Sequence, residues 1–177
     1  VLIMAKIGIF YGSTSGITEE IATTIREKLG EEECDLYSME DDFDEYDQLL
    51  EYDYLLLGCS TWGAGDVQND WRDPLFEMEL EKPDFSGKTI ALFGAGDQVD
   101  HGTEFVSALG KMYNHFKTLG ATLVGEFPNE GYSFEYSSAL VDDKFVGLPI
   151  DEINQSDKTE ERIDQWVESI RPIFLDD

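Results

Sequence analysis

The chain has 177 residues, of which 41% are hydrophobic and 12% aromatic, enough for one globular domain with a sizeable core. Its 39 acidic and 12 basic residues give a formal net charge of −27, which argues against nucleic acid or an anionic membrane as a partner and favours a basic protein. A surface charged only for solubility, or adapted to salt, explains most of these carboxylates equally well.

The start of the chain and the cysteines indicate the compartment. Residues 1–3 precede Met4 without a basic region or a cleavage pattern, so no signal peptide is expected. The apolar stretches are too short to span a bilayer, so no membrane insertion is expected. Cys34 and Cys59 match no metal-binding or redox spacing, and Cys59 ends an apolar run, where a buried, reduced thiol is expected. We therefore expect a cytoplasmic protein.

The first expected elements are a buried strand ending at Gly12, a loop of small hydroxyl residues and a helix. In that order they form an anion site, because amides freed at the helix start point toward the ligand. Hydroxyl side chains add donors, and glycines let the backbone approach closely. The candidate binding residues are Ser13, Thr14, Ser15, Gly16, Ile17 and Thr18.

The loop does not match the common nucleotide motifs. Ile17, not glycine, stands five residues after Gly12, and no lysine follows to reach nucleotide phosphates. The G-x-G-x-x-G pattern is also absent. A site for a single phosphate held by neutral donors remains, while a polar connection with an ordinary helix cap explains the loop alone equally well.

Strands and helices alternate along the first half of the chain. Apolar residues recur every four positions from Ile17 to Leu29, which predicts a helix closed by Gly30. The elements expected next are a short strand at 34–37, helical spacing within 40–51, a strand buried on both faces at 54–59, a loop at 60–68 and a helix through 71–80 with Pro74 in its first turn.

The second half repeats this pattern with one interruption. The elements expected are a buried strand at 89–93, a helix at 105–119 closed by Gly120, a fifth strand at 121–126, and a polar, aromatic excursion at about 127–144. A final helix should begin with a capping box of Asp157 and Glu160 and stop at Pro172.

This alternation predicts an α/β fold, a doubly wound parallel sheet with helices on both faces. In such sheets ligands bind at the carboxyl ends of the strands. Three loops with unusual content, at 13–18, 60–65 and 94–101, follow strands one, three and four. They converge if these strands are neighbours.

Two rings in these loops suggest the ligand. Trp62 stands among glycines, and His101 follows a Gly-x-Gly turn. The two could bracket a flat ring, so a phosphate site at one end and rings at the other describe a mononucleotide. Taken alone, Trp62 also fits a core tryptophan, and His101 fits a surface histidine better than a binding residue.

Four motifs together resemble those of the flavodoxins. They are Phe10-Tyr11-Gly12-Ser13-Thr14-Ser15-Gly16-Ile17-Thr18, Gly58-Cys59-Ser60-Thr61-Trp62, Gly94-Ala95-Gly96-Asp97-Gln98 and Asp151-Glu152-Ile153-Asn154-Gln155-Ser156-Asp157. The resemblance runs from about Ala5 to the C-terminus. It implies one flavodoxin-like domain over residues 1–177 with a five-stranded parallel sheet of order 2-1-3-4-5. Residues 127–144 resemble the insertion of the long-chain class in the fifth strand.

The resemblance implies a carrier and not an enzyme: noncovalently bound FMN, cycling mainly between semiquinone and hydroquinone, shuttles single electrons at low potential. It implies that residues 13–18 hold the phosphate. It implies that the flavin ring is surrounded by Thr61, Trp62, Gly63, Ala64, Gly65, Gly94, Ala95, Gly96, Asp97, Gln98 and His101. No catalytic or metal-binding residues are expected.

The implied partners are basic-faced redox proteins, such as ferredoxin–NADP reductase or photosystem I, and reductive acceptor enzymes, with the carrier itself a monomer. Three positions depart from the family. His101 replaces a tyrosine found in most relatives, Ile17 replaces lysine in several, and Ile153 stands where a polar residue is common.

The residues also suggest how the potentials are set. A tight turn with Gly63 and Ala64 at its centre suits type II′, and we expect the Gly63 carbonyl to turn toward flavin N5 on reduction and to accept a hydrogen bond from the proton gained there. Carboxylates, with Asp66, Asp97 and Asp100 expected nearest, should oppose the second reduction. A protonated His101 should favour it.

Three other functions fit parts of the sequence. An FMN-dependent reductase of the same fold needs room over the ring, which Trp62 would obstruct. A phosphoacceptor signalling domain needs acidic residues after strands one and three, where this chain has Gly12-Ser13 and Cys59-Ser60, so we reject it. A phosphate-binding module without redox activity is the third.

Overall fold

The structure, a computed structural model, describes residues 5–175, so the expectation for residues 1–3 lies outside it. Within that range a six-stranded parallel sheet forms the centre of the molecule. Its strands are β1 (Ile7–Gly12), β2 (Cys34–Ser38), β3 (Tyr54–Cys59), β6 (Thr89–Ala95), β7 (Thr122–Val124) and β11 (Leu148–Ile150). The central strands β1, β3 and β6 are almost entirely buried, as their unbroken apolar runs predict.

The strand order confirms the predicted 2-1-3-4-5 arrangement, with its fifth position divided. From one edge the order is β2, β1, β3, β6, and both β7 and β11 then pair with β6. β7 lies beside residues 89–91 and β11 beside residues 93–95. β7 is shorter than the predicted strand at 121–126 because Gly125 turns the chain with a φ of 84°, and its carbonyl accepts a hydrogen bond from Trp166 Nε1 at 2.8 Å.

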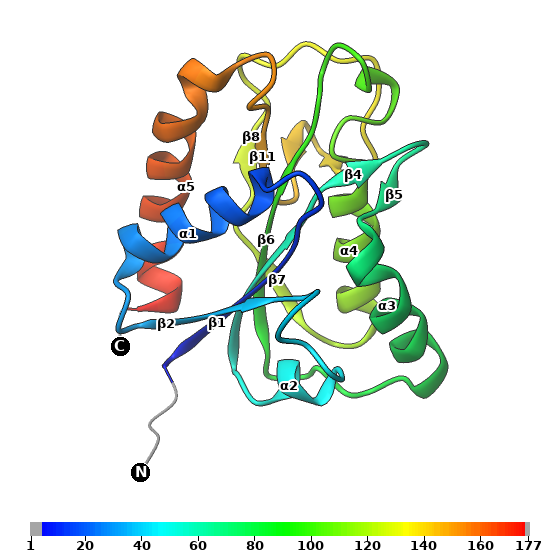
Figure 1. Cartoon of the computed structure of the whole chain (residues 1–177), viewed down its shortest axis with the longest axis vertical. Helices are drawn as coiled ribbons and strands as arrows, with labels where there is room; N and C mark the ends of the chain where they lie inside the picture. The colour runs from blue at the N-terminus through cyan, green and yellow to red at the C-terminus, as the bar shows by residue number, and fades with distance from the viewer. Residues whose placement is uncertain (1–4, 176–177) are drawn as a thin grey trace.

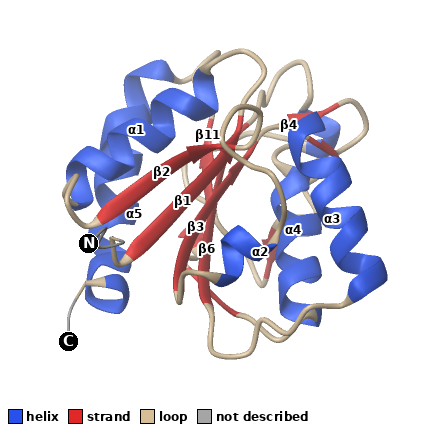
Figure 2. Ribbon diagram, turned by 60° about the horizontal axis from the view of Figure 1, so that its bottom comes forward, coloured by secondary structure: helices blue, strands red, loops and turns tan. Residues whose placement is uncertain are grey.

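Helices cover both faces of this sheet, which confirms the doubly wound fold (Figure 1). α1 and α5 lie on one face and α3 and α4 on the other, and Figure 2 shows the same three layers from another direction. The helices are α1 (Ile17–Leu29), α2 (Asp47–Leu50), α3 (Asn69–Glu81), α4 (Ser107–Thr118) and α5 (Thr159–Phe174), with 3-10 turns η1 (Gly102–Glu104) and η2 (Ser156–Lys158).

Three helical segments differ from their predictions. The acidic segment 40–51 forms only the single turn α2, with turns and irregular chain around it. Pro74 lies in the second turn of α3 rather than the first, where its missing N–H removes one helical hydrogen bond. α4 begins at Ser107, later than predicted, because the buried Val106 has a left-handed backbone with a φ of 46°.

The last helix begins and ends differently from its prediction. No side chain caps α5, whose N-cap residue is Lys158, so the predicted capping box of Asp157 and Glu160 is wrong. Pro172 lies inside the helix and does not stop it. The helix continues to Phe174, whose buried ring packs against Tyr54 with centroids 5.6 Å apart, and this burial offsets the hydrogen bond that proline cannot make.

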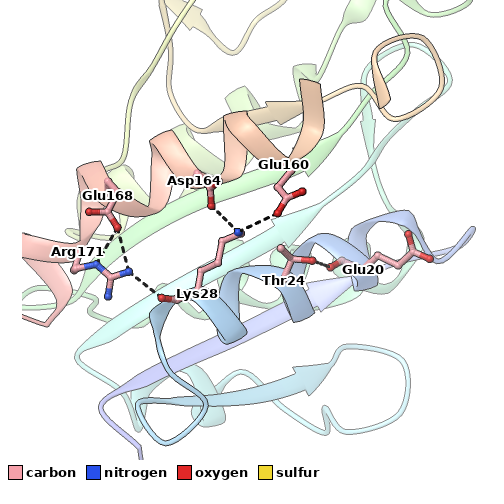
Figure 3. Close-up of polar contacts among 7 residues, drawn as sticks. All are labelled: Glu20, Thr24, Lys28, Glu160, Asp164, Glu168 and Arg171. Atoms are coloured by element: carbon pink, nitrogen blue, oxygen red, sulfur yellow. Dashed lines mark hydrogen bonds and ion pairs between the residues drawn. The ribbon is translucent and has the colours of Figure 1, made fainter. Parts of the chain in front are cut away.

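Charged groups join α1 to α5 on their shared face (Figure 3). Lys28 Nζ lies 2.5 Å from Asp164 Oδ1 and 3.7 Å from Glu160 Oε1. The hydrogen bond with Asp164 raises the pKa of Lys28. Arg171 donates to the carbonyl of Lys28 at 2.8 Å and bonds to Glu168. The carboxylates are more than half exposed, so these pairs orient the two helices more than they stabilise them.

Between β7 and β11 the chain builds a small antiparallel sheet. Its strands are β8 (Phe127–Pro128), β9 (Leu140–Val141) and β10 (Lys144–Phe145), in the order β8-β10-β9. Phe105 and Phe145 are fully buried, and their rings contact those of Tyr132 and Phe134 in tilted or edge-on arrangements. Arg162 lies 3.8 Å above the Tyr132 ring. This aromatic cluster packs the excursion against the start of α4.

Candidate functional site

The loop after β1 and the start of α1 hold a nest of unused backbone donors. In the described chain, the amides of residues 13–15 and 17–19 donate to no acceptor of the protein. The Gly16 amide bonds to Ser13 Oγ at 3.0 Å. Gly16 caps α1 with a φ of 92°, and a Cβ placed on it would meet no atom within 4 Å. Free amides around open space at a helix N-terminus favour an anion.

Gln68 supports this loop from behind. Its Nε2 donates to Thr14 Oγ1 at 3.1 Å, and its Oε1 accepts from the Asp70 amide at 3.0 Å and so caps α3. A Cβ on Gly12 would lie 2.2 Å from that Oε1 and 2.8 Å from Trp71 Cδ1, so a side chain at the end of β1 would displace the Gln68 amide from Thr14. Sequence reasoning missed Gln68, because a polar residue before a helix has the signal of an ordinary cap.

A hairpin, β4 (Thr61–Trp62) with β5 (Asp66–Val67), stands where the sequence predicts a loop. Gly63 has a φ of 52°, while Ala64 is not among the residues with positive φ. Type II would force a positive φ on Ala64, so the backbone agrees with the predicted type II′ turn. Thr61 Oγ1 accepts from the Ala108 amide at 3.0 Å, which fixes the hairpin to the start of α4.

Polar side chains in the loop after β6 bond within the protein. Asp97 Oδ1 accepts from the amides of residues 99 and 100 at 3.0 and 2.9 Å and from Asn154 Nδ2 at 2.8 Å. Burial alone would raise the pKa of Asp97, but these hydrogen bonds outweigh it and lower the pKa. Gln98 donates to the buried Asp151 through its backbone and its side chain. These two side chains shape the loop, so a ligand there would meet mainly backbone.

The three predicted loops all follow the carboxyl ends of neighbouring strands, along one edge of the sheet (Figure 1). Gly12 pairs with Cys59 and Gly58 with Phe93, so β1, β3 and β6 end side by side. Trp62 lies on this edge with 44% of its surface exposed, so it is not a core tryptophan. His101 is also exposed.

Other parts of the described chain carry less chemistry. Residues 5–175 contain no grouping of His, Cys, Asp and Glu fit to hold a metal, and no helix among them is long and apolar enough to cross a membrane. Cys34 and Cys59 are buried, which raises the pKa of each thiol to about 12. A hollow of about 760 Å³ lies between the ends of α3 and α4. We place the site at the strand ends instead, because the unused amides are there.

Comparison with known proteins decides the family. The flavodoxin family model matches residues 9–166. The chain belongs to the flavodoxin family. It is 63% identical to flavodoxin 1 of Azotobacter vinelandii over 172 residues, which cover 97% of this chain and 99% of the relative. Flavodoxin 1 of Escherichia coli is 46% identical over 168 residues, or 94% of this chain and 93% of the relative. A crystal structure of Fusobacterium nucleatum flavodoxin bound to flavin mononucleotide has a TM-score of 0.87 at 29% identity, covering 97% and 99% of the two chains.

Membership of this family selects among the functions that the sequence left open. As a flavodoxin the chain is a flavin-based electron carrier and not an enzyme, which sets aside the reductase and the phosphate-binding module without redox activity.

Proposed function

We propose that this flavodoxin binds FMN noncovalently at the carboxyl ends of β1, β3 and β6. The observation that carries the proposal is the nest of unused amides at residues 13–15 and 17–19, which suits a phosphate. No lysine or arginine occurs between residues 7 and 25, so the loop itself offers a phosphate only neutral donors. When bound, FMN supplies one-electron chemistry at low potential, mainly between its half-reduced and fully reduced forms.

Each end of the cofactor has its own set of residues in this proposal. The phosphate is assigned to residues 13–18, with Gln68 holding Thr14 in place. The flavin ring is assigned to residues 61–65 and 94–98 with His101. The hairpin anchored by Thr61 supports this assignment, because it presents Trp62 at the surface beside the strand ends.

The partners follow from charge. A net charge of −27 favours redox proteins with basic faces, such as ferredoxin–NADP reductase, photosystem I and reductive acceptor enzymes. We propose that the carrier is a monomer, because like charge opposes self-association. The buried, unpaired thiols of Cys34 and Cys59 support a reducing cytoplasm.

Gly63→Val tests how the hairpin meets the flavin. Valine at a φ of 52° is strained by roughly 1–3 kcal/mol, so the turn should no longer present its carbonyl to N5. The formation constant of the half-reduced flavin should fall about tenfold to hundredfold, measured by absorption during stepwise anaerobic reduction. Ala64→Val is the matched control, because Ala64 lacks a positive φ. A full yield of the half-reduced form in Gly63→Val would contradict this role.

His101→Tyr tests the charge beside the ring. One unit charge about 10 Å from the flavin ring changes the free energy of the fully reduced anion by roughly 1.7 kcal/mol at an effective dielectric of about 20. For a one-electron step this shifts the reduction potential by about 70 mV. Of the carboxylates expected near the ring, Asp66 is already paired with Lys111 at 3.3 Å. An imidazole at residue 101 can carry a positive charge that a phenol cannot, so potentiometry should give a lower second potential for His101→Tyr than for the parent. Equal second potentials in the two proteins would exclude the effect.

A further inference from the structure

α3 carries large apolar side chains on two opposite faces. Trp71, Leu75 and Met78 are buried against the sheet, as an amphipathic helix requires. Phe76 and Leu80 point the other way and are 59% and 68% exposed. They are four residues apart and therefore neighbours on the helix surface, so together they form an apolar stripe that the core does not use.

Acidic residues border this stripe. Asp73 and Glu77 are both exposed and lie within one helical turn of Phe76. In the described chain neither carboxylate forms a hydrogen bond or an ion pair, so both charges remain available to a partner. The α3 stripe, defined as Asp73, Phe76, Glu77 and Leu80, thus combines apolar surface with unpaired negative charge.

The stripe lies on the helix that follows the Trp62 hairpin, beside which we place the flavin. Only Gln68 separates the Trp62 hairpin from the start of α3 (Figure 1). At about 1.5 Å per residue, Phe76 and Leu80 lie about 10 and 17 Å along the helix from its start. An interface of about 800 Å² on one partner corresponds to a disc of roughly 16 Å radius. A partner that covers the Trp62 edge can therefore reach the stripe.

We propose that the α3 stripe is a docking surface for redox partners, fitting a protein whose apolar groove is bordered by lysine and arginine. The proposal rests on the proposed carrier function and adds an apolar anchor to a surface otherwise recognised by charge. Charge selects this occupant over a second copy of the chain, since two copies at −27 repel each other.

The test compares three variants, with ferredoxin–NADP reductase as the basic probe. Phe76→Ser with Leu80→Ser should slow reduction of the FMN-loaded protein about tenfold at both low and high salt, the loss expected for a well-buried apolar anchor. Asp73→Asn with Glu77→Gln should slow it at low salt only, because salt screens exposed charges. Ile173→Ser, an apolar residue 43% exposed on α5, is the matched control and should change nothing.

Two further measurements make the result decisive. At high salt, oxidation by ferricyanide, which needs no docking groove, should proceed at the parent rate in all variants. Thermal unfolding should also be unchanged, since every substituted side chain is exposed. Unchanged reductase rates and unchanged calorimetric affinity in Phe76→Ser with Leu80→Ser would overturn the inference. So would a parent dimer that this variant abolishes. A folded chain that takes up no FMN would overturn the carrier function instead, while calorimetry with the reductase would still decide the docking.

Discussion

Ser15→Asp is expected to weaken FMN binding by about three orders of magnitude. Ser15 is exposed beside the unused amides, so aspartate would enter the nest without disturbing the core. Two unit charges about 4 Å apart repel by about 4 kcal/mol at an effective dielectric of about 20, and every 1.4 kcal/mol is tenfold in affinity. Titration of the apoprotein, followed by quenching of flavin fluorescence, measures the change.

Two controls separate charge from shape in this experiment. Ser15→Asn adds a side chain of almost the same size without the charge and should cost far less. Riboflavin, which has no phosphate, should bind the parent and Ser15→Asp with similar affinity. If Ser15→Asp binds FMN as tightly as the parent does, the nest is not the phosphate site.

Gly94→Ala is expected to destabilise the fold itself. A Cβ at this position would lie 2.1 Å from the carbonyl oxygen of Cys59 and 3.1 Å from Leu109 Cδ2, so the backbone of β3 must move. The loops after β3 and β6 would move with it. We expect a loss of about 3 kcal/mol in the free energy of unfolding, or a melting temperature lower by about 6–12 °C, and weaker FMN binding.

Gly102→Ala is the matched control for this prediction. Its Cβ would meet nothing nearer than 3.8 Å, and Gly102 has no positive φ. Urea unfolding of the two apoproteins measures the difference in stability directly. Equal stability of the two variants would mean that β3 and β6 can separate at low cost, and the close approach of the two strands would then not hold the site together.

The sequence predicts the sheet well because each central strand is an unbroken apolar run. The side chains of residues 54–57 and 89–93 are mostly apolar on both faces of the sheet. Helices must therefore cover both faces to keep them from water. Elements whose ends depend on distant packing were harder to predict. α5 continues past Pro172 because Phe174 packs on Tyr54, and β7 ends at the turn where the Gly125 carbonyl bonds to Trp166. No local pattern reports those contacts.

Some features of the site could also be predicted from the sequence and others could not. The nest and the turn at Gly63 could be predicted, because small residues, hydroxyls and positive φ are local signals. The bonds of Gln68 to Thr14 and of Ala108 to Thr61 could not, because they join residues 54 and 47 positions apart. Only the fold reveals that these polar groups position the two ends of the site.

Calorimetric titration of the folded apoprotein with FMN and, in parallel, with riboflavin tests the central claim most directly. If neutral donors at the start of α1 hold the phosphate, FMN should bind at least about a thousandfold more tightly than riboflavin, a difference of about 4 kcal/mol. Equal affinities would contradict the claim, and no uptake of FMN by the folded protein would contradict the proposed carrier as well.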